Sequence, residues 1–315
     1  MSGLQHLKPS GKAIFKDRYV KKTNELLGNH EGDFHLIGAP LSKSSISHSG
    51  ASFAPAAIRR MLASYTTYSI EDDIDLSKVR IQDYGDVNMH PIDAVESQNR
   101  IYLSVKEVLR KRHSENLILL GGDHSVTAPS VKAFQEQNGK VGIIQFDAHH
   151  DLRNLEDGGP TNGTPFRSLL ESGIIEGKNL IQIGIRNFAN GKEYTDYAKS
   201  QGITVYTMKD VRSRGTKDLL VDSLAKLEKE ADHIYLSVDM DVLDQAFAPG
   251  CPAIGPGGMD SQSLLEAIEY AGTNKKVKGI DIVEIDPTLD IRDMTSRLGA
   301  WVLLSYVKGK IKGSS

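Results

Sequence analysis

The sequence predicts an α/β protein with a mostly parallel sheet that helices cover on both faces. Short apolar, β-branched runs recur from residue 34 onward, and longer amphipathic segments separate them. Strands and helices that alternate in this way are typical of parallel sheets with right-handed crossovers. The sequence contains no internal repeat and no Pro- or Ser-rich linker. We therefore expect one domain.

Eight apolar runs are predicted strands, and seven amphipathic segments are predicted helices. The strands are Phe34–Gly38, Val79–Gly85, Leu117–Gly121, Val141–Phe146, Leu180–Ile185, Ile203–Thr207, His233–Val238 and Gly279–Ile285. The helices are Pro55–Ala63, Ala94–Arg112, Val126–Gln137, Lys192–Ser200, Lys217–Glu230, Ser261–Ala271 and about Ser296–Lys310. Residues 1–33 are polar and basic, without the apolar core of a signal peptide. We expect an N-terminal extension over 1–33 and a single domain over 34–315.

The composition argues against several classes of function. The formal net charge is -3, so no broad basic surface favours nucleic acid or an anionic membrane as a partner. No stretch approaches the roughly 20 apolar residues that span a bilayer. The single cysteine, Cys251, cannot form an internal disulfide, which suits a reducing compartment. We expect a cytoplasmic protein that binds neither nucleic acid nor membranes.

Three predicted strands are followed by acidic or histidine-bearing clusters. Ligands of open parallel sheets bind beyond the carboxyl ends of the strands, which makes these clusters the candidate site. The clusters are GGDHS at 121–125, FDAHHD at 146–151 and SVDMDVLD at 237–244. Their candidate metal ligands are His124, Asp147, His149, Asp151, Asp239 and Asp241.

The spacing and chemistry of these residues predict a pair of divalent metal ions. Side chains alternate with period two in extended backbone, so those of each cluster can project to one side. Four neighbouring carboxylates repel one another unless cations lie between them. Two histidines and four aspartates without cysteine suit Mn²⁺ better than structural zinc. Two such ions lower the pKa of a shared water molecule, as hydrolysis at neutral pH requires.

At these residues the sequence resembles the ureohydrolase superfamily, which contains arginases, agmatinases and formimidoylglutamases. The three clusters carry the resemblance, and Gly50–Arg59 and Gly184–Arg186 add weaker support. The likeness covers nearly all of residues 34–310. It implies a three-layer α/β/α fold around an eight-stranded, mostly parallel sheet, with two Mn²⁺ ions per subunit held by the six ligands. It also implies a homo-oligomer, commonly a trimer or hexamer.

Within this superfamily, residues 151–167 discriminate among substrates. Arginases and agmatinases carry a histidine, usually opening a His-Gly pair, shortly after the last acid of the second cluster. Here the matching pair is Asn162-Gly163, which counts against both activities. The Asp-Leu-Arg and Asn-Gly-Thr-Pro-Phe-Arg pattern instead resembles the formimidoylglutamases of histidine degradation. These hydrolyse N-formimidoyl-L-glutamate, an amidine, to L-glutamate and formamide.

The resemblance and the chemistry of this substrate imply residue roles. Glu284, at the end of a predicted strand, matches the family acid that holds the planar cation, and Asp151 would orient the attacking hydroxide. Two substrate carboxylates call for arginine forks and amide donors. The nearby loop offers Arg153, Asn154, Asn162 and Arg167. The group that replaces the family histidine as proton donor is not assigned: His150 is a candidate, but period two points it away from the ligands.

Two alternatives remain open at this stage. Glu156 and Asp157 could receive the ammonium group of agmatine, so agmatinase or another guanidino or amidino hydrolase is the enzymatic alternative. An inactive homologue that keeps the fold for assembly or regulation is the non-enzymatic one. Clustered acids without a metal would destabilise a fold, and the intact ligand set therefore argues against the second alternative.

Overall fold

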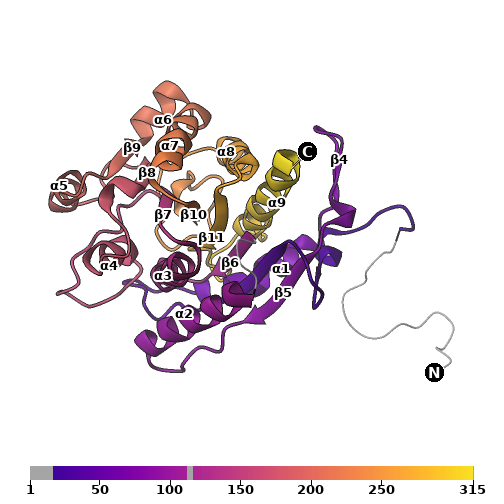
Figure 1. The fold of residues 1–315 in the computed structure, drawn as a ribbon, viewed down its shortest axis with the longest axis horizontal. Coiled ribbons are helices and arrows are strands. Elements are labelled where there is room, and N and C mark those ends of the chain that lie inside the picture. Colours follow the sequence, from indigo (N-terminus) through magenta and orange to yellow (C-terminus); the bar gives the residue numbers. More distant parts are fainter. Residues whose placement is uncertain (1–16, 112–115, 315) are drawn as a thin grey trace.

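The computed structural model describes residues 17–111 and 116–314 and has three layers, α/β/α (Figure 1). The middle layer is a nine-stranded sheet in the order β1-β5-β2-β6-β11-β10-β7-β8-β9, and its strand pairs are all parallel. The strands are β1 (Leu27–Gly28), β2 (Phe34–Ala39), β5 (Ile81–Asp86), β6 (Asn116–Gly121), β7 (Val141–Phe146), β8 (Leu180–Ile185), β9 (Thr204–Thr207), β10 (His233–Asp239) and β11 (Val277–Val283). Among the described residues, no helix has the length and apolar character to cross a membrane.

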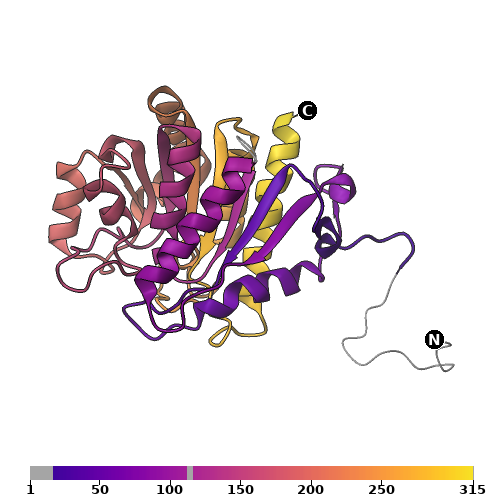
Figure 2. The same ribbon diagram turned by 60° about the horizontal axis from the view of Figure 1, so that its bottom comes forward.

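Helices cover both faces of the sheet and enclose a hydrophobic core on each (Figure 2). One face carries α1 (Ala54–Leu62), α6 (Met208–Arg214), α7 (Thr216–Glu230), α8 (Ser261–Thr273) and α9 (Met294–Ser314). The other carries α2 (Ala94–Lys111), α3 (Thr127–Asn138), α4 (Pro165–Glu171) and α5 (Lys192–Ser200). Within β7, Val141 and Ile143 face the second core, whereas Ile144 and Phe146 face the first. Burial on both faces explains why this strand is a continuous apolar run.

The predicted α/β class and parallel sheet are confirmed, but the sheet has nine strands where eight were expected. The additional strand, β1, has two residues and pairs with β5 through its backbone, so it needs no apolar pattern. It lies within the expected N-terminal extension, of which residues 1–16 are outside the described part. Arg112 of the predicted helix Ala94–Arg112 is also outside it. The short helices α4 and α6 and the hairpin β3 (Tyr68–Ser69) to β4 (Ile74–Asp75) were not predicted.

The topology brings the candidate ligands to one edge of the sheet. Strands β6, β11, β10 and β7 are consecutive neighbours, and parallel neighbours end on the same side. The register pairs Val238 of β10 with Phe146 of β7, and Asp239 with Val283 of β11. The segments that follow these strands therefore start side by side.

Gly122, in the segment after β6, shows how closely the chain packs at this edge. A Cβ atom at this position would lie 1.8 Å from the carbonyl oxygen of Leu41. The Gly122 carbonyl also accepts a hydrogen bond from the backbone N–H of Glu284, at 2.9 Å. Only glycine lets the segment that leads into His124 pass between these two neighbours.

Replacing Gly122 with alanine is expected to destabilise the protein by about 1–3 kcal/mol, because the added methyl group overpacks against backbone. Urea unfolding monitored by circular dichroism measures the change. Gly158→Ala is the matched control, since a Cβ there would meet nothing within 4 Å. Equal unfolding free energies for the two variants would contradict the close packing at Gly122.

Candidate metal centre

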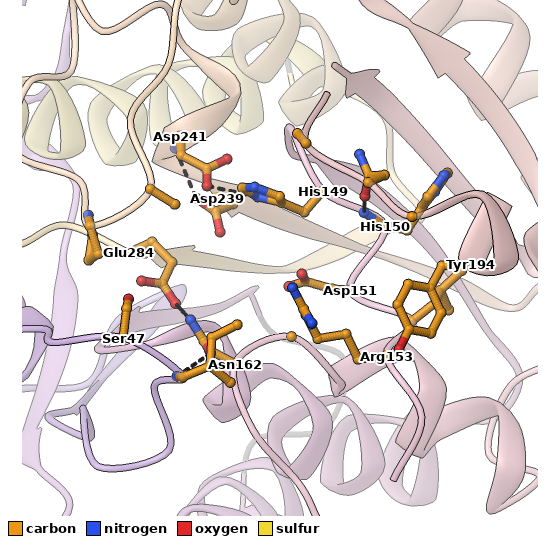
Figure 3. A pocket seen from close by; sticks show the side chains of 18 residues that line it. Ser47, His149, His150, Asp151, Arg153, Asn162, Tyr194, Asp239, Asp241 and Glu284 are labelled. Atoms are coloured by element: carbon orange, nitrogen blue, oxygen red, sulfur yellow. Dashed lines mark hydrogen bonds and ion pairs between the residues drawn. The ribbon is translucent and has the colours of Figure 1, made fainter. Parts of the chain in front are cut away.

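Six predicted ligands converge beyond the carboxyl ends of three strands. His124 opens a short 3-10 helix, His124–Val126, after β6, and the second cluster follows β7. Asp239 ends β10, and Asp241 lies in the short 3-10 helix Met240–Val242 that follows. In Figure 3, Asp151, Asp239, Asp241 and His149 face a common cavity. Two residues in the segments that follow strands have a left-handed backbone: Asp151, after β7, and Glu284, after β11, have positive φ angles of 51° and 61°.

The ligands form two groups that share Asp147. In the first, His124 Nδ1 lies 2.7 Å from a carboxylate oxygen of Asp151 and 3.2 Å from oxygens of Asp147 and Asp239. In the second, His149 Nδ1 lies 3.0 Å from Asp241 and 3.4 Å from Asp147. The ligand atoms of each group lie within 4.8 Å of one another. Each group can thus surround one ion.

The buried nitrogen of His124 indicates that a cation belongs in the first group. Its Nδ1 is buried without a hydrogen-bond partner and faces the three carboxylates. On the other side of the ring, Nε2 lies 2.9 Å from Ser237 Oγ, which donates to Asp281 at 2.8 Å. The Ser237 hydroxyl therefore accepts the Nε2 proton and leaves the Nδ1 lone pair for a metal ion.

The electrostatics of the cluster lead to the same conclusion. Burial and the charge of Asp147 raise the pKa of Asp151 to about 6. Burial, Asp241 and Asp147 raise the pKa of Asp239 well above its usual range. Burial alone would lower the pKa of His124, but its contacts with Asp147, Asp151 and Asp239 raise that pKa well above its usual value. The site thus attracts positive charge, and its oxygen and imidazole donors fit Mn²⁺.

A cavity of about 560 Å³ opens over the ligands, and Glu284 lies in its wall. Glu284 Oε1 accepts hydrogen bonds from the backbone N–H of His124 at 2.7 Å and from Asn162 Nδ2 at 3.1 Å. Burial and the charge of Asp123 raise the pKa of Glu284 to about 8. Asn162 Oδ1 accepts from the backbone N–H of Ile46 at 3.0 Å. Asn162 therefore links the loop that carries it to both Glu284 and the loop before α1.

Two of the four predicted substrate-binding residues line the cavity, and the other two lie outside its wall. Arg153 and Asn162 line the cavity (Figure 3), and among the described lining residues Arg153 is the one arginine or lysine. Asn154 lies beside an adjoining hollow and donates to Asp157 at 2.7 Å. Arg167 is not in the cavity wall: it pairs with Glu171, and its guanidinium lies 3.7 Å from the ring centre of Tyr197.

Tyr194 lines the cavity and was missed by sequence reasoning. It belongs to α5, where a tyrosine in an amphipathic segment carries no functional signal. Its hydroxyl oxygen accepts a hydrogen bond from Asn154 Nδ2 at 3.3 Å, which connects α5 to the loop after Asp151. His150, considered above as a proton donor, directs Nδ1 to Gln182 at 2.7 Å and Nε2 to Thr195 at 3.1 Å. Neither ring nitrogen faces the ligands.

Comparisons with known proteins agree with this geometry. The family model "Arginase family" matches residues 32–308. Formimidoylglutamase of Halalkalibacterium halodurans is 57% identical over 95% of both chains. The crystal structure of Bacillus subtilis formimidoylglutamase superposes with a TM-score of 0.93 at 48% identity, covering 97% of this chain and 96% of that one. Trypanosoma cruzi formiminoglutamase with Mn²⁺ shares the fold, with a TM-score of 0.85 at 24% identity over 92% and 98% of the chains.

These matches confirm the resemblance that the three strand-end clusters carried. The family match and the full-length relatives also confirm that the chain is an enzyme of the hydrolase class. The chain belongs to the arginase family.

Proposed function

We propose that this protein hydrolyses N-formimidoyl-L-glutamate to L-glutamate and formamide, with two Mn²⁺ ions held by the six-ligand cluster. One observation carries the choice of substrate: Arg153 faces a cavity whose other charged groups are ligands or Glu284. A substrate with an amidine at one end and carboxylates at the other matches that distribution of charge. The names of relatives at 57% and 48% identity support the choice. The reaction would belong to histidine degradation.

Glu284 is proposed to hold the amidine group. Its Oε1 already accepts two hydrogen bonds, from His124 and Asn162, whereas no bond is assigned to Oε2 among the described residues. A planar amidinium presents parallel N–H donors that suit a carboxylate. The cation would also stabilise ionised Glu284, whose pKa is otherwise raised. Asn162 keeps the Glu284 carboxylate oriented, a task that a neutral amide performs without adding charge.

Asp151 is proposed to manage the proton. When bound, two Mn²⁺ ions would lower the pKa of water and polarise the amidine carbon. The Asp151 carboxylate lies both in the ligand group and in the cavity wall, so it can orient the attacking water and accept its proton. The same carboxylate can then protonate the departing glutamate amine. This assignment needs no histidine at position 162.

The agmatinase alternative is less compatible with the cavity. The ammonium end of agmatine would approach Arg153, and like charges repel. Asp157, considered as its partner, accepts a hydrogen bond from Asn154 and lies outside the main cavity wall.

We also propose, from the family resemblance, a cytoplasmic protein that forms a trimer or hexamer, with residues 34–315 as its catalytic domain. The exposed side chains of Phe188 and Ile254 would suit burial between subunits.

Removing the metal is expected to lower the thermal stability of the protein, because the buried carboxylates lose the cations that offset their repulsion. Saturating Mn²⁺ should restore about 2.7 kcal/mol per site at a hundredfold excess over Kd. Differential scanning calorimetry of chelator-treated and Mn²⁺-loaded protein measures the shift, and metal analysis should give two ions per chain. Identical melting curves with no bound metal would contradict the metal centre.

The substrate is tested by incubating Mn²⁺-loaded protein in parallel with N-formimidoyl-L-glutamate, agmatine and L-arginine. We expect formamide from the first and no urea from the other two, because agmatine and arginine carry an ammonium group at the end away from the guanidinium, whereas the first substrate carries two carboxylates and no ammonium there. Turnover of agmatine alone would overturn the substrate assignment. Absence of turnover by fully Mn²⁺-loaded protein would overturn the proposed activity.

Arg153→Gln is expected to lower kcat/KM for N-formimidoyl-L-glutamate by about 10- to 100-fold, in line with the loss of a hydrogen bond to a charged group. Steady-state kinetics should show the loss mainly in KM, since Arg153 would contact the part of the substrate that does not react. Arg167→Gln should have a much smaller effect, because that guanidinium already contacts Glu171 and Tyr197. The reverse order would assign the carboxylate contact to Arg167.

A further inference from the structure

A buried row of polar side chains crosses the sheet directly beneath the metal centre. Its four members lie near the carboxyl ends of four neighbouring strands, and each is fully buried. The strand register places them side by side. From β11 to β8 the polar row consists of Asp281, Ser237, Gln145 and Gln182. Polar groups inside a sheet are costly unless they are hydrogen-bonded.

Gln145 connects the polar row to the ligand that both ion groups share. Its Nε2 donates to Asp147 Oδ2 at 2.7 Å and to the backbone carbonyl of His149 at 3.1 Å. Both amide hydrogens are thereby used, which leaves Gln145 Oε1 as an acceptor. Gln182 Nε2 supplies the matching donor at 2.6 Å.

Gln182 extends this chain of hydrogen bonds to His150. Its Nε2 also donates to the backbone carbonyl of His150 at 2.8 Å, so Gln182 Oε1 must accept. The donor is His150 Nδ1, at 2.7 Å. The His150 ring is held in turn by Thr195 Oγ1 at 3.1 Å, and its backbone N–H by Asn190 Oδ1 at 2.8 Å. The hydrogen bonds therefore run one way, from His150 through two glutamines to the carboxylate.

We propose that His150 is a positioning residue for the metal centre. Through Gln182 and Gln145 it fixes the carboxylate of Asp147, whose two oxygens serve the two ion groups. The carbonyls of His149 and His150, held by the same glutamines, set the path of the turn that ends at Asp151 in its left-handed conformation. The inference rests on the metal centre of the proposed function and does not depend on the identity of the substrate.

The role is tested by Mn²⁺ binding, which needs no turnover. His150→Leu removes the Nδ1 donor and keeps much of the buried volume. Titrating metal-free protein with Mn²⁺, with free ion measured by electron paramagnetic resonance, should show affinity weakened by about 10- to 100-fold, as for other groups that orient ligands. His35→Leu is the matched control: His35 is a fully buried histidine on β2, outside the polar row. It should leave Mn²⁺ affinity unchanged.

His150→Asn separates positioning from packing, because its side-chain amide can place a donor near the position of Nδ1. It should restore most of the Mn²⁺ affinity, whereas Gln182→Glu, which cannot donate to Gln145, should lose it as His150→Leu does. At saturating Mn²⁺, His150→Leu should regain kcat with KM unchanged. Wild-type Mn²⁺ affinity in His150→Leu would overturn the proposal. So would a loss of Mn²⁺ affinity in both His150→Asn and His35→Leu as large as that in His150→Leu. If the variants change Mn²⁺ affinity as expected but the protein does not hydrolyse N-formimidoyl-L-glutamate, only the proposed function is contradicted.

Discussion

The mutual repulsion of four aspartates at one edge of a sheet is the constraint on which the structure of this site depends. Asp147, Asp151, Asp239 and Asp241 lie within two small groups with His124 and His149, and Asp147, Asp239 and Asp241 are buried. Burial, together with the charge of neighbouring aspartates, raises the pKa values of Asp151 and Asp239. Divalent cations relieve this repulsion. The same concentration of positive charge that stabilises the site makes it suited to activating water.

The parallel sheet makes this concentration of charge attainable. Four adjacent strands end together, so short segments are enough to deliver every ligand. Close packing at Gly122 lets the segment before His124 reach the edge. Beneath the ligands, Gln145 and Gln182 satisfy one another and the turn after β7, which leaves little freedom for Asp147 to rotate. Rigid support of this kind keeps metal ligands in place before an ion binds.

The loop after Asp151 is proposed to have a different task, the selection of the substrate that reaches the ligands. Its Asn162 joins Glu284 to the loop before α1, and its Arg153 gives the cavity a positive wall. The cavity wall thus contains, at different positions, the acid that would hold an amidine, Glu284, and the cation that would hold a carboxylate, Arg153. Family members with the same ligands can therefore differ in substrate through this loop, because specificity lies in loops carried by a shared fold.

By itself, the sequence determined the α/β class, eight strands, most of the helices and the three ligand clusters, because apolar periodicity and strand-end motifs are local properties of the chain. It did not determine β1, which pairs through backbone, or the short helices α4 and α6. Only the tertiary structure decided that Arg153 enters the cavity while Arg167 packs on Tyr197, and that Tyr194 joins the wall. The polar row likewise depends on register between β11, β10, β7 and β8. Such pairings join residues far apart in sequence, and no local pattern encodes which strand will lie beside which.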